Sequence, residues 1–200
     1  MKSPRSGVRH PLLFYRRTMD RVWITTLLLG IVLAGAVGFN LLNPTHLLGL
    51  SSDTWMLVAA VVAFVLSGFA FFSRWRAYVQ AQPDSLNIVT PFLRFRLSYK
   101  RMRGVRPTLT QQLFPPEKSS WSQRSYLEPF YGQTALVVEL RGFPLKPALL
   151  KLFLPDAMFA RTTTGLVLVV ADWMQLSTEI DSFRGAWLQA ESVARLGRRS

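Results

Sequence analysis

Residues that could carry out chemistry are few in this chain. It contains no cysteine and only two histidines, His10 and His46, so neither thiolate catalysis nor a thiolate metal site is available. Nine acidic residues follow residue 73, and no histidine accompanies them. Carboxylates can act as general acids or bases together with lysine or tyrosine, but no such constellation is visible in their spacing: Asp84, Glu117, Glu128, Glu139, Asp156, Asp172, Glu179, Asp181 and Glu191.

Motifs that bind phosphate or metal are also missing. The sequence has no Gly-Lys-Ser/Thr phosphate loop, no paired-histidine zinc motif and no Gly-x-Ser-x-Gly nucleophile motif. We therefore expect a protein without enzymatic activity, without a cofactor and without a bound metal.

The most concentrated chemistry is the positive charge of RFRLSYKRMRGVR, residues 94–106. This stretch holds six Lys or Arg residues and no acid. Together with two arginines upstream it makes a basic patch, in which only Asp84 opposes eight basic residues: Arg74, Arg76, Arg94, Arg96, Lys100, Arg101, Arg103 and Arg106.

Several surfaces could face this basic patch. The charges could lie on a solvated strand face, or they could bind anionic lipid headgroups. Each basic residue near an anionic membrane surface contributes about 1 kcal/mol to the free energy of binding. An acidic partner protein is a further alternative. Nucleic acid is not expected, because single-strand binders expose aromatic residues beside a basic groove, whereas Phe95, Leu97 and Tyr99 alternate away from the basic side.

Two long segments without charge determine where the basic patch can lie. No Lys, Arg, Asp or Glu occurs between Arg21 and Asp53, or from Thr54 to Ser73. Each segment exceeds the roughly 18 apolar residues that cross a bilayer as a helix. We expect transmembrane helices over residues 22–42 and 54–72, joined by a short loop as a hairpin over residues 22–73.

These segments have two other interpretations. As buried helices of a soluble core, they would leave only about 125 residues to surround two segments that have no polar face. As a cleaved signal peptide, the first segment would offer Ala36-Val37-Gly38 as small residues near a cleavage site. However, the apolar stretch continues through Leu42, and its basic leader is 21 residues long.

Flanking charge predicts the orientation of the hairpin. Six Lys or Arg residues lie in the basic N-terminal tail, residues 1–21, none lies between the two segments, and Arg74 and Arg76 follow the second segment directly. Basic residues concentrate on the cytoplasmic side of membrane proteins. We expect a multi-pass protein of the plasma membrane with both termini in the cytoplasm.

The predicted spans contain small residues four positions apart, which let helix backbones approach closely. These residues either seal the two helices into one hairpin or dock one helix on a membrane-protein partner. The spans contain no ionisable side chain, so a charged transport path is not expected. The candidate packing residues are Gly30, Ala34 and Gly38 in the first span, and Ala59, Ala63 and Ser67 in the second.

Residues 74–200 change to short alternating segments separated by turn residues, which is typical of a β-rich domain. We predict strands over residues 86–89, 94–100, 105–109, 134–141, 148–154 and 164–171. Residues 111–133 are expected to form a long loop whose aromatic residues dip into the membrane interface or pack on the domain. Apolar residues then recur at helical spacing, which predicts an amphipathic helix over residues 174–196.

The segments DSLNIVTPFLRFRLSY (84–99) and VLVVADW (167–173), with their place after two apolar spans, resemble the bacterial pleckstrin-homology-like (PH-like) domains of small membrane proteins. This resemblance covers about 60% of the chain and rests on hydrophobic patterns. It implies a mainly-β fold of two packed antiparallel sheets with a C-terminal helix, and it implies no reaction. The expected function is a membrane-anchored interaction or assembly module, or alternatively an accessory subunit of a larger bacterial membrane complex.

Overall fold

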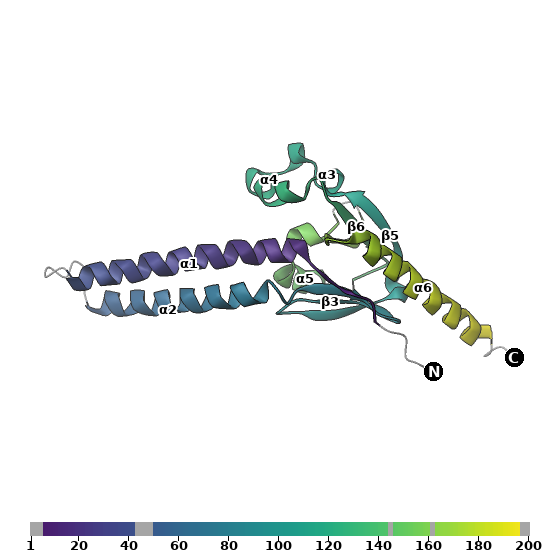
Figure 1. Ribbon diagram of the computed structural model, residues 1–200, viewed down its shortest axis with the longest axis horizontal. Helices are drawn as coiled ribbons and strands as arrows, with labels where there is room; N and C mark the ends of the chain where they lie inside the picture. Colours follow the sequence, from purple (N-terminus) through teal and green to yellow (C-terminus); the bar gives the residue numbers. More distant parts are fainter. Residues whose placement is uncertain (1–5, 43–49, 144–145, 161–162, 197–200) are drawn as a thin grey trace. The chain divides into compact units, whose positions relative to one another are not determined.

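The computed structural model describes residues 6–42, 50–143, 146–160 and 163–196. The chain forms a β unit, made of Met1–Tyr15 and Arg76–Ser200, and a hairpin unit, made of Arg16–Trp75. The expected order of two long apolar helices, two antiparallel sheets and a C-terminal helix is confirmed (Figure 1). The expected loop between the helices, with His46, lies at residues 43–49 outside the described part.

The hairpin unit contains helix α2, Leu50–Ser73, and helix α1, Leu13–Leu42, apart from the first three residues of α1, which belong to the β unit. Both are long and apolar enough to cross a membrane, and they run side by side in Figure 1. Helix α1 begins before the predicted start at Val22. Hydropathy marks where the apolar part begins, whereas arginines such as Arg16 and Arg17 are good helix formers and extend the helix backwards.

Residues 1–21 were predicted to form a separate tail, but their described part, from residue 6 onward, belongs to the folded units. Residues Arg9–Pro11 form strand β1, which pairs antiparallel with strand β2, Tyr78–Ala81. The backbone N–H of Leu12 donates to the carbonyl of Ala77 at 3.2 Å. Leu12, Phe14 and Tyr15 are each only 1% exposed, so the residue before α1 and the first turn of α1 belong to the core of the β unit.

Sheet A has the strand order β1-β2-β3-β4, with β3 at Ser85–Val89 and β4 at Arg94–Ser98. Strand side chains alternate between faces, and the register Val79–Ile88–Phe95 places three buried apolar residues in one row on the inner face. The neighbouring row, Arg9–Gln80–Asn87–Arg96, lies on the opposite, outer face, where Arg9 and Arg96 are exposed and Asn87 is buried. Strand β2 was not among the predicted strands.

Sheet B has the order β5-β6-β7, formed by Met102–Leu109, Thr134–Leu140 and Gly165–Leu168. All four residues of β7 are buried, as are five of the seven in β6. Gly165 is required where β7 meets β6, because a Cβ there would lie 2.6 Å from the carbonyl oxygen of Val138. These apolar strands therefore supply the second half of the core.

Two predicted segments have a different structure. The expected loop at residues 111–133 contains four short helical elements: α3 (Thr110–Leu113), η2 (Pro116–Lys118), α4 (Trp121–Leu127) and η3 (Glu128–Phe130). The expected strand at 148–154 was wrong, because helix α5 spans Pro147–Phe153. Two further 3₁₀ turns lie at Tyr99–Arg101 (η1) and Asp156–Met158 (η4).

Helix α6, Trp173–Leu196, closes the β unit near the range expected for it. It contacts both sheets, through β2 and β6. Only Leu176 and Ile180 of this helix are buried. The first half of α6 therefore packs on the sheets, and residues 192–196 at its end are exposed.

Candidate functional site

One end of the hairpin unit carries a cluster of charged and aromatic side chains. Arg74 Nη1 lies 3.1 Å from Asp20 Oδ1, which joins the end of α2 to the first part of α1. The Arg74 guanidinium also lies 4.2 Å from the ring centroid of Phe71 and 5.3 Å from that of Trp75. Cation–π contacts of this kind favour a fixed arginine, so Arg74 is held by its own unit.

The opposite end of the hairpin unit is joined by a buried polar pair. Asn40 Nδ2 donates a hydrogen bond of 2.6 Å to Asp53 Oδ2. The two residues are 2% and 8% exposed. Because a buried polar group is costly without a partner, this hydrogen bond favours one register of α1 against α2. Asp53 lies just outside the predicted spans, 22–42 and 54–72, so this pair was not predicted.

Small residues line the contact between α1 and α2, but the two predicted stripes are only partly correct. Gly30, Ala63 and Ser67 are buried. A Cβ added to Gly30 would lie 3.1 Å from the ring of Phe64. The hydroxyl of Ser67 donates to the carbonyl of Trp23 at 2.9 Å.

The other predicted packing residues lie away from this contact. Ala34 and Ala59 are exposed, and a Cβ added to Gly38 would meet nothing within 4 Å. An i, i+4 step turns about 40° beyond a full helical turn, so a stripe with that spacing drifts off the contact face. The buried positions instead recur seven apart, as at Gly30 and Val37.

The eight residues of the basic patch do not form one surface. Arg74 is paired with Asp20 in the hairpin unit, and Arg106 is paired with Glu139 in sheet B. Arg101 donates to the backbone carbonyl of Phe143 at 3.1 Å. The remaining residues, Arg76, Arg94, Arg96, Lys100 and Arg103, are exposed in the β unit.

The exposed charges fall into groups at different places. Arg94 begins strand β4, whereas Lys100 and Arg103 follow its end. The five residues of β4 cover about 13 Å at 3.3 Å per step, which exceeds the Debye length of about 8 Å in physiological salt. Arg94 is therefore largely screened from Lys100 and Arg103, and Arg96 lies between them on β4.

The outer face of sheet A carries a basic residue that the sequence analysis assigned to the tail. The register aligns Arg9 with Gln80, Gln80 with Asn87, and Asn87 with Arg96. The Arg9 guanidinium lies 4.8 Å from the ring centroid of Tyr78. Only the strand pairing of residues 9–11, which no local pattern revealed, brings Arg9 beside the basic residues of β4.

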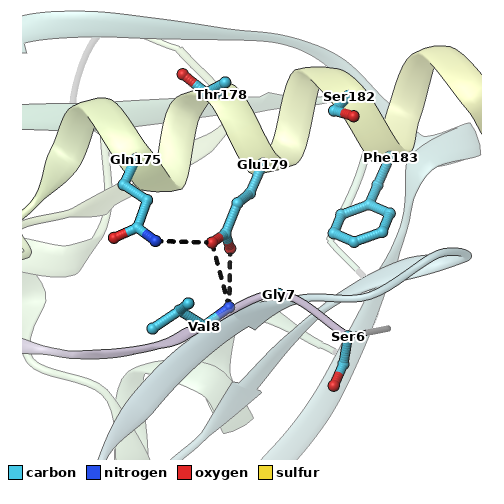
Figure 2. A pocket seen from close by; sticks show the side chains of 8 residues that line it. All are labelled: Ser6, Gly7, Val8, Gln175, Thr178, Glu179, Ser182 and Phe183. Atoms are coloured by element: carbon cyan, nitrogen blue, oxygen red, sulfur yellow. Dashed lines mark hydrogen bonds between the residues drawn. The ribbon is translucent and has the colours of Figure 1, made fainter. Parts of the chain in front are cut away.

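A shallow depression of about 520 Å³ lies between the N-terminal segment and α6 (Figure 2). The Glu179 carboxylate accepts hydrogen bonds from the backbone N–H of Val8, at 3.1 and 3.2 Å, and from Gln175 Nε2 at 3.3 Å. His10 Nε2 lies 3.7 Å from the same carboxylate. The depression is lined by Ser6, Gly7, Val8, Gln175, Thr178, Glu179, Ser182 and Phe183.

Through these contacts, the Glu179 carboxylate attaches the N-terminal segment to α6. A Cβ on Gly7 would collide with this carboxylate, so glycine permits the close approach of the backbone to α6. Among the described residues, no group of three or more His, Cys, Asp or Glu side chains could hold a metal ion. We therefore assign this site a structural role, in which it holds β1 and the residues before it against α6.

Comparisons with known proteins found no relative of this chain. The chain matches no protein-family model, and no curated protein or solved structure is significantly similar to it.

Proposed function

We propose that this chain is a bacterial membrane protein whose two apolar helices anchor a non-enzymatic PH-like interaction module at the cytoplasmic face of the plasma membrane. The observation that carries the proposal is the exposure of the helices. Of the most apolar window in each helix, only 11% of α1 and 28% of α2 is buried. Helices of a soluble core bury such side chains, and a bilayer is the solvent that accepts them exposed.

The end of the hairpin unit that carries Arg74 supports the proposed orientation. Trp23, Phe71 and Trp75 surround or flank Arg74 there, and Arg16 lies 5.6 Å from the Trp75 ring centroid. Aromatic residues gather at membrane interfaces, and basic residues gather on the cytoplasmic side. This end is the cytoplasmic one in our proposal.

The β unit is the interaction module in this proposal. Two antiparallel sheets and a C-terminal helix are the layout that the sequence resemblance implies. Its exposed cations, including Arg94 and Arg96 on the outer face of sheet A, suit anionic lipid headgroups or an acidic partner protein. We propose no role in nucleic-acid binding.

The mass of the purified full-length protein tests the stand-alone module. Light scattering during size-exclusion chromatography in a mild detergent should give a monodisperse protein of the mass of this chain, after the mass of the detergent is subtracted. Mass spectrometry of protein taken gently from its native membrane should identify no stoichiometric membrane partner. A reproducible partner with several spans would contradict the stand-alone module.

The alternative is an accessory subunit of a larger membrane complex. One observation favours it, namely the small residues that the hairpin does not use internally. Ala34 and Ala59 are exposed, and the space around Gly38 is open. Small residues on an outer helix face let another helix approach closely in a membrane. In that case the partner protein would dock on α1 or α2 at these positions.

A further inference from the structure

The connections to both apolar helices leave the β unit from the same end of sheet A. Its last row is Pro11–Tyr78–Val89–Arg94. Helix α1 begins at Leu13, just after Pro11, and strand β2 begins at Tyr78, soon after α2 ends at Ser73. Five backbone steps separate Ser73 from Tyr78, and they cover at most about 18 Å. We call this end of sheet A the span-proximal end.

The turn between β3 and β4 closes the span-proximal end. Its conformation is fixed by Thr90, whose backbone N–H donates to the carbonyl of Leu93 at 2.8 Å and whose hydroxyl accepts from the N–H of Leu93 at 3.0 Å. Between these residues lies Phe92, which is 52% exposed. A large aromatic residue is therefore held at the tip of an ordered turn.

Helix α5 extends this turn into an apolar surface. The rings of Phe92 and Phe153 are stacked, with centroids 6.4 Å apart and planes at 27°. Leu150 is fully buried and faces the core, while Leu149 is 44% exposed and Leu152 is 74% exposed. We call Phe92, Leu149, Leu152 and Phe153 the apolar tip.

Basic residues surround the apolar tip. Lys146 precedes α5, Lys151 lies within it, and Arg94 follows the turn, and all three are exposed. Apolar side chains flanked by lysine or arginine are typical of segments that lie in a membrane interface, because the apolar groups enter the acyl boundary while the cations remain among the phosphates. Charge complementarity favours an anionic leaflet over an uncharged one.

We infer that the apolar tip inserts into the headgroup–acyl boundary of the cytoplasmic leaflet and gives the β unit a contact with lipid besides its covalent links to the helices. The inference rests on the membrane anchoring proposed above. It follows from the register of sheet A, because the tip lies at the end from which both helices depart. The role assigned to Lys146, Lys151 and Arg94 is to bind lipid phosphates around the inserted side chains.

The absence of cysteine allows a direct test with single labels in the full-length protein. An environment-sensitive fluorophore is attached to Leu152→Cys, and the protein is reconstituted into phosphatidylcholine–phosphatidylglycerol vesicles with or without brominated acyl chains. Leu149→Cys supplies a second position in the tip. Val32→Cys, at a 67% exposed site on α1, reports the bilayer, and Val193→Cys, at a 69% exposed site on α6, reports water.

Val193 is a suitable aqueous control because of where α6 leads. Arg184 Nη2 donates to the carbonyl of Arg103 at 2.7 Å, and Arg103 lies beyond the end of β4 that is opposite the span-proximal end. Val193 is nine residues further along α6, or about 13 Å. Its exposure matches that of Leu152, so the two labels differ chiefly in which end of the β unit they occupy.

The inference predicts that brominated lipid at least halves the fluorescence at Leu152→Cys and Val32→Cys and leaves Val193→Cys unchanged, while aqueous iodide quenches only Val193→Cys. If Leu152→Cys and Leu149→Cys behave like Val193→Cys while Val32→Cys meets lipid, the apolar tip lies in water and only this inference fails. Shielding of the tip from both quenchers would show a protein contact instead and would also overturn it. A Val32→Cys label that brominated lipid does not reach would contradict the membrane anchoring itself.

Discussion

At the scale of single residues, the core of the β unit depends on a few polar groups with defined partners. Tyr99 is 2% exposed, and its hydroxyl donates to the carbonyl of Gln82 at 2.6 Å. Tyr99→Phe removes this donor and leaves the carbonyl without it, so we expect a loss of about 1 kcal/mol in the free energy of unfolding. Urea unfolding of the full-length protein in detergent measures it. Tyr78→Phe is the control, because no hydrogen bond of the Tyr78 hydroxyl is seen in the described residues.

The same residue predicts a pH dependence. Burial of the phenol raises the pKa of Tyr99, and the negative charge of Asp84 adds to the increase. The pKa in the folded state therefore lies above the unfolded value of about 10. Its contribution is fully present below pH of about 10 and decreases as the pH rises toward the folded pKa, because the unfolded chain releases the proton first. Tyr99→Phe should lose less stability than wild type over that alkaline range, and equal losses would contradict the assignment.

Two neighbouring arginines of the basic patch should behave differently. Arg74 is paired with Asp20 and lies over the Phe71 ring, whereas Arg76 is exposed. Arg74→Gln should lower the stability of the hairpin unit by about 1 kcal/mol, and Arg76→Gln should change it little. Thermal unfolding in detergent compares the two variants. Equal effects would show that the pairing of Arg74 contributes nothing to stability.

At the scale of elements, the hydrogen bond between the Glu179 carboxylate and the Val8 N–H holds the N-terminal segment against α6. Glu179→Ala removes the acceptor of the Val8 N–H, which should increase amide exchange across residues 7–12 by about tenfold, since a hydrogen bond to a charged group contributes about 1.5 kcal/mol. Thr178→Ala, on the same helix, is the control, because the Thr178 hydroxyl donates within α6 to the carbonyl of Met174. Unchanged exchange after loss of the carboxylate would show that β1 is held by sheet pairing alone.

Two glycines of α1 separate the two roles proposed for small residues. Gly30→Leu would press on the ring of Phe64, whereas Gly38→Leu would enter open space. We expect Gly30→Leu to destabilise the hairpin unit by about 1–3 kcal/mol through overpacking, and Gly38→Leu to leave it intact. Thermal unfolding in detergent tests both changes. Loss of a co-purifying membrane protein on Gly38→Leu alone would favour the accessory-subunit function.

Some helices and strands could be predicted from the sequence, and others could not. The apolar helices, the strands β3, β4, β6 and β7 and the helix α6 were predictable, because long charge-free runs and regular alternation are local signals. Residues 148–154 were mistaken for a strand because a short segment that is apolar except for Lys151 has no distinguishing period. The proline at the start of α5 was the overlooked signal for a helix.

Long-range contacts explain the remaining differences. Strand β1 has only three residues, and its pairing with β2 joins residues about 70 apart in the chain, which no local pattern encodes. In the same way, the lobe at residues 110–130 is ordered around Phe14. The ring of Phe14 lies 5.0 Å from that of Phe130, and the hydroxyl of Tyr126 donates to the Phe14 carbonyl at 2.7 Å. Long-range contacts also changed the predicted basic patch. The pairing of β1 with β2 places Arg9 beside the basic residues of β4, and the ion pair with Asp20 holds Arg74 in the hairpin unit.

At the scale of the whole molecule, the chain combines a hairpin unit of two apolar helices with a β unit that has its own core. The core of the β unit includes His10 and Leu12 from before the first helix, as well as residues of the sheets that follow the second. In the membrane arrangement that we propose, the segments on both sides of the two apolar helices therefore lie on the same side of the membrane. An even number of membrane crossings is the arrangement that satisfies this requirement.

The measurement that tests this central claim most directly is the accessibility of single cysteines in intact cells. A membrane-impermeant thiol reagent is applied to variants with cysteine at Thr45, between the two helices, or at Ser200. The account predicts labelling of Thr45→Cys in intact cells, and labelling of Ser200→Cys only after the membrane is opened. Labelling of Ser200→Cys in intact cells, or protection of Thr45→Cys until the membrane is opened, would contradict the proposed topology.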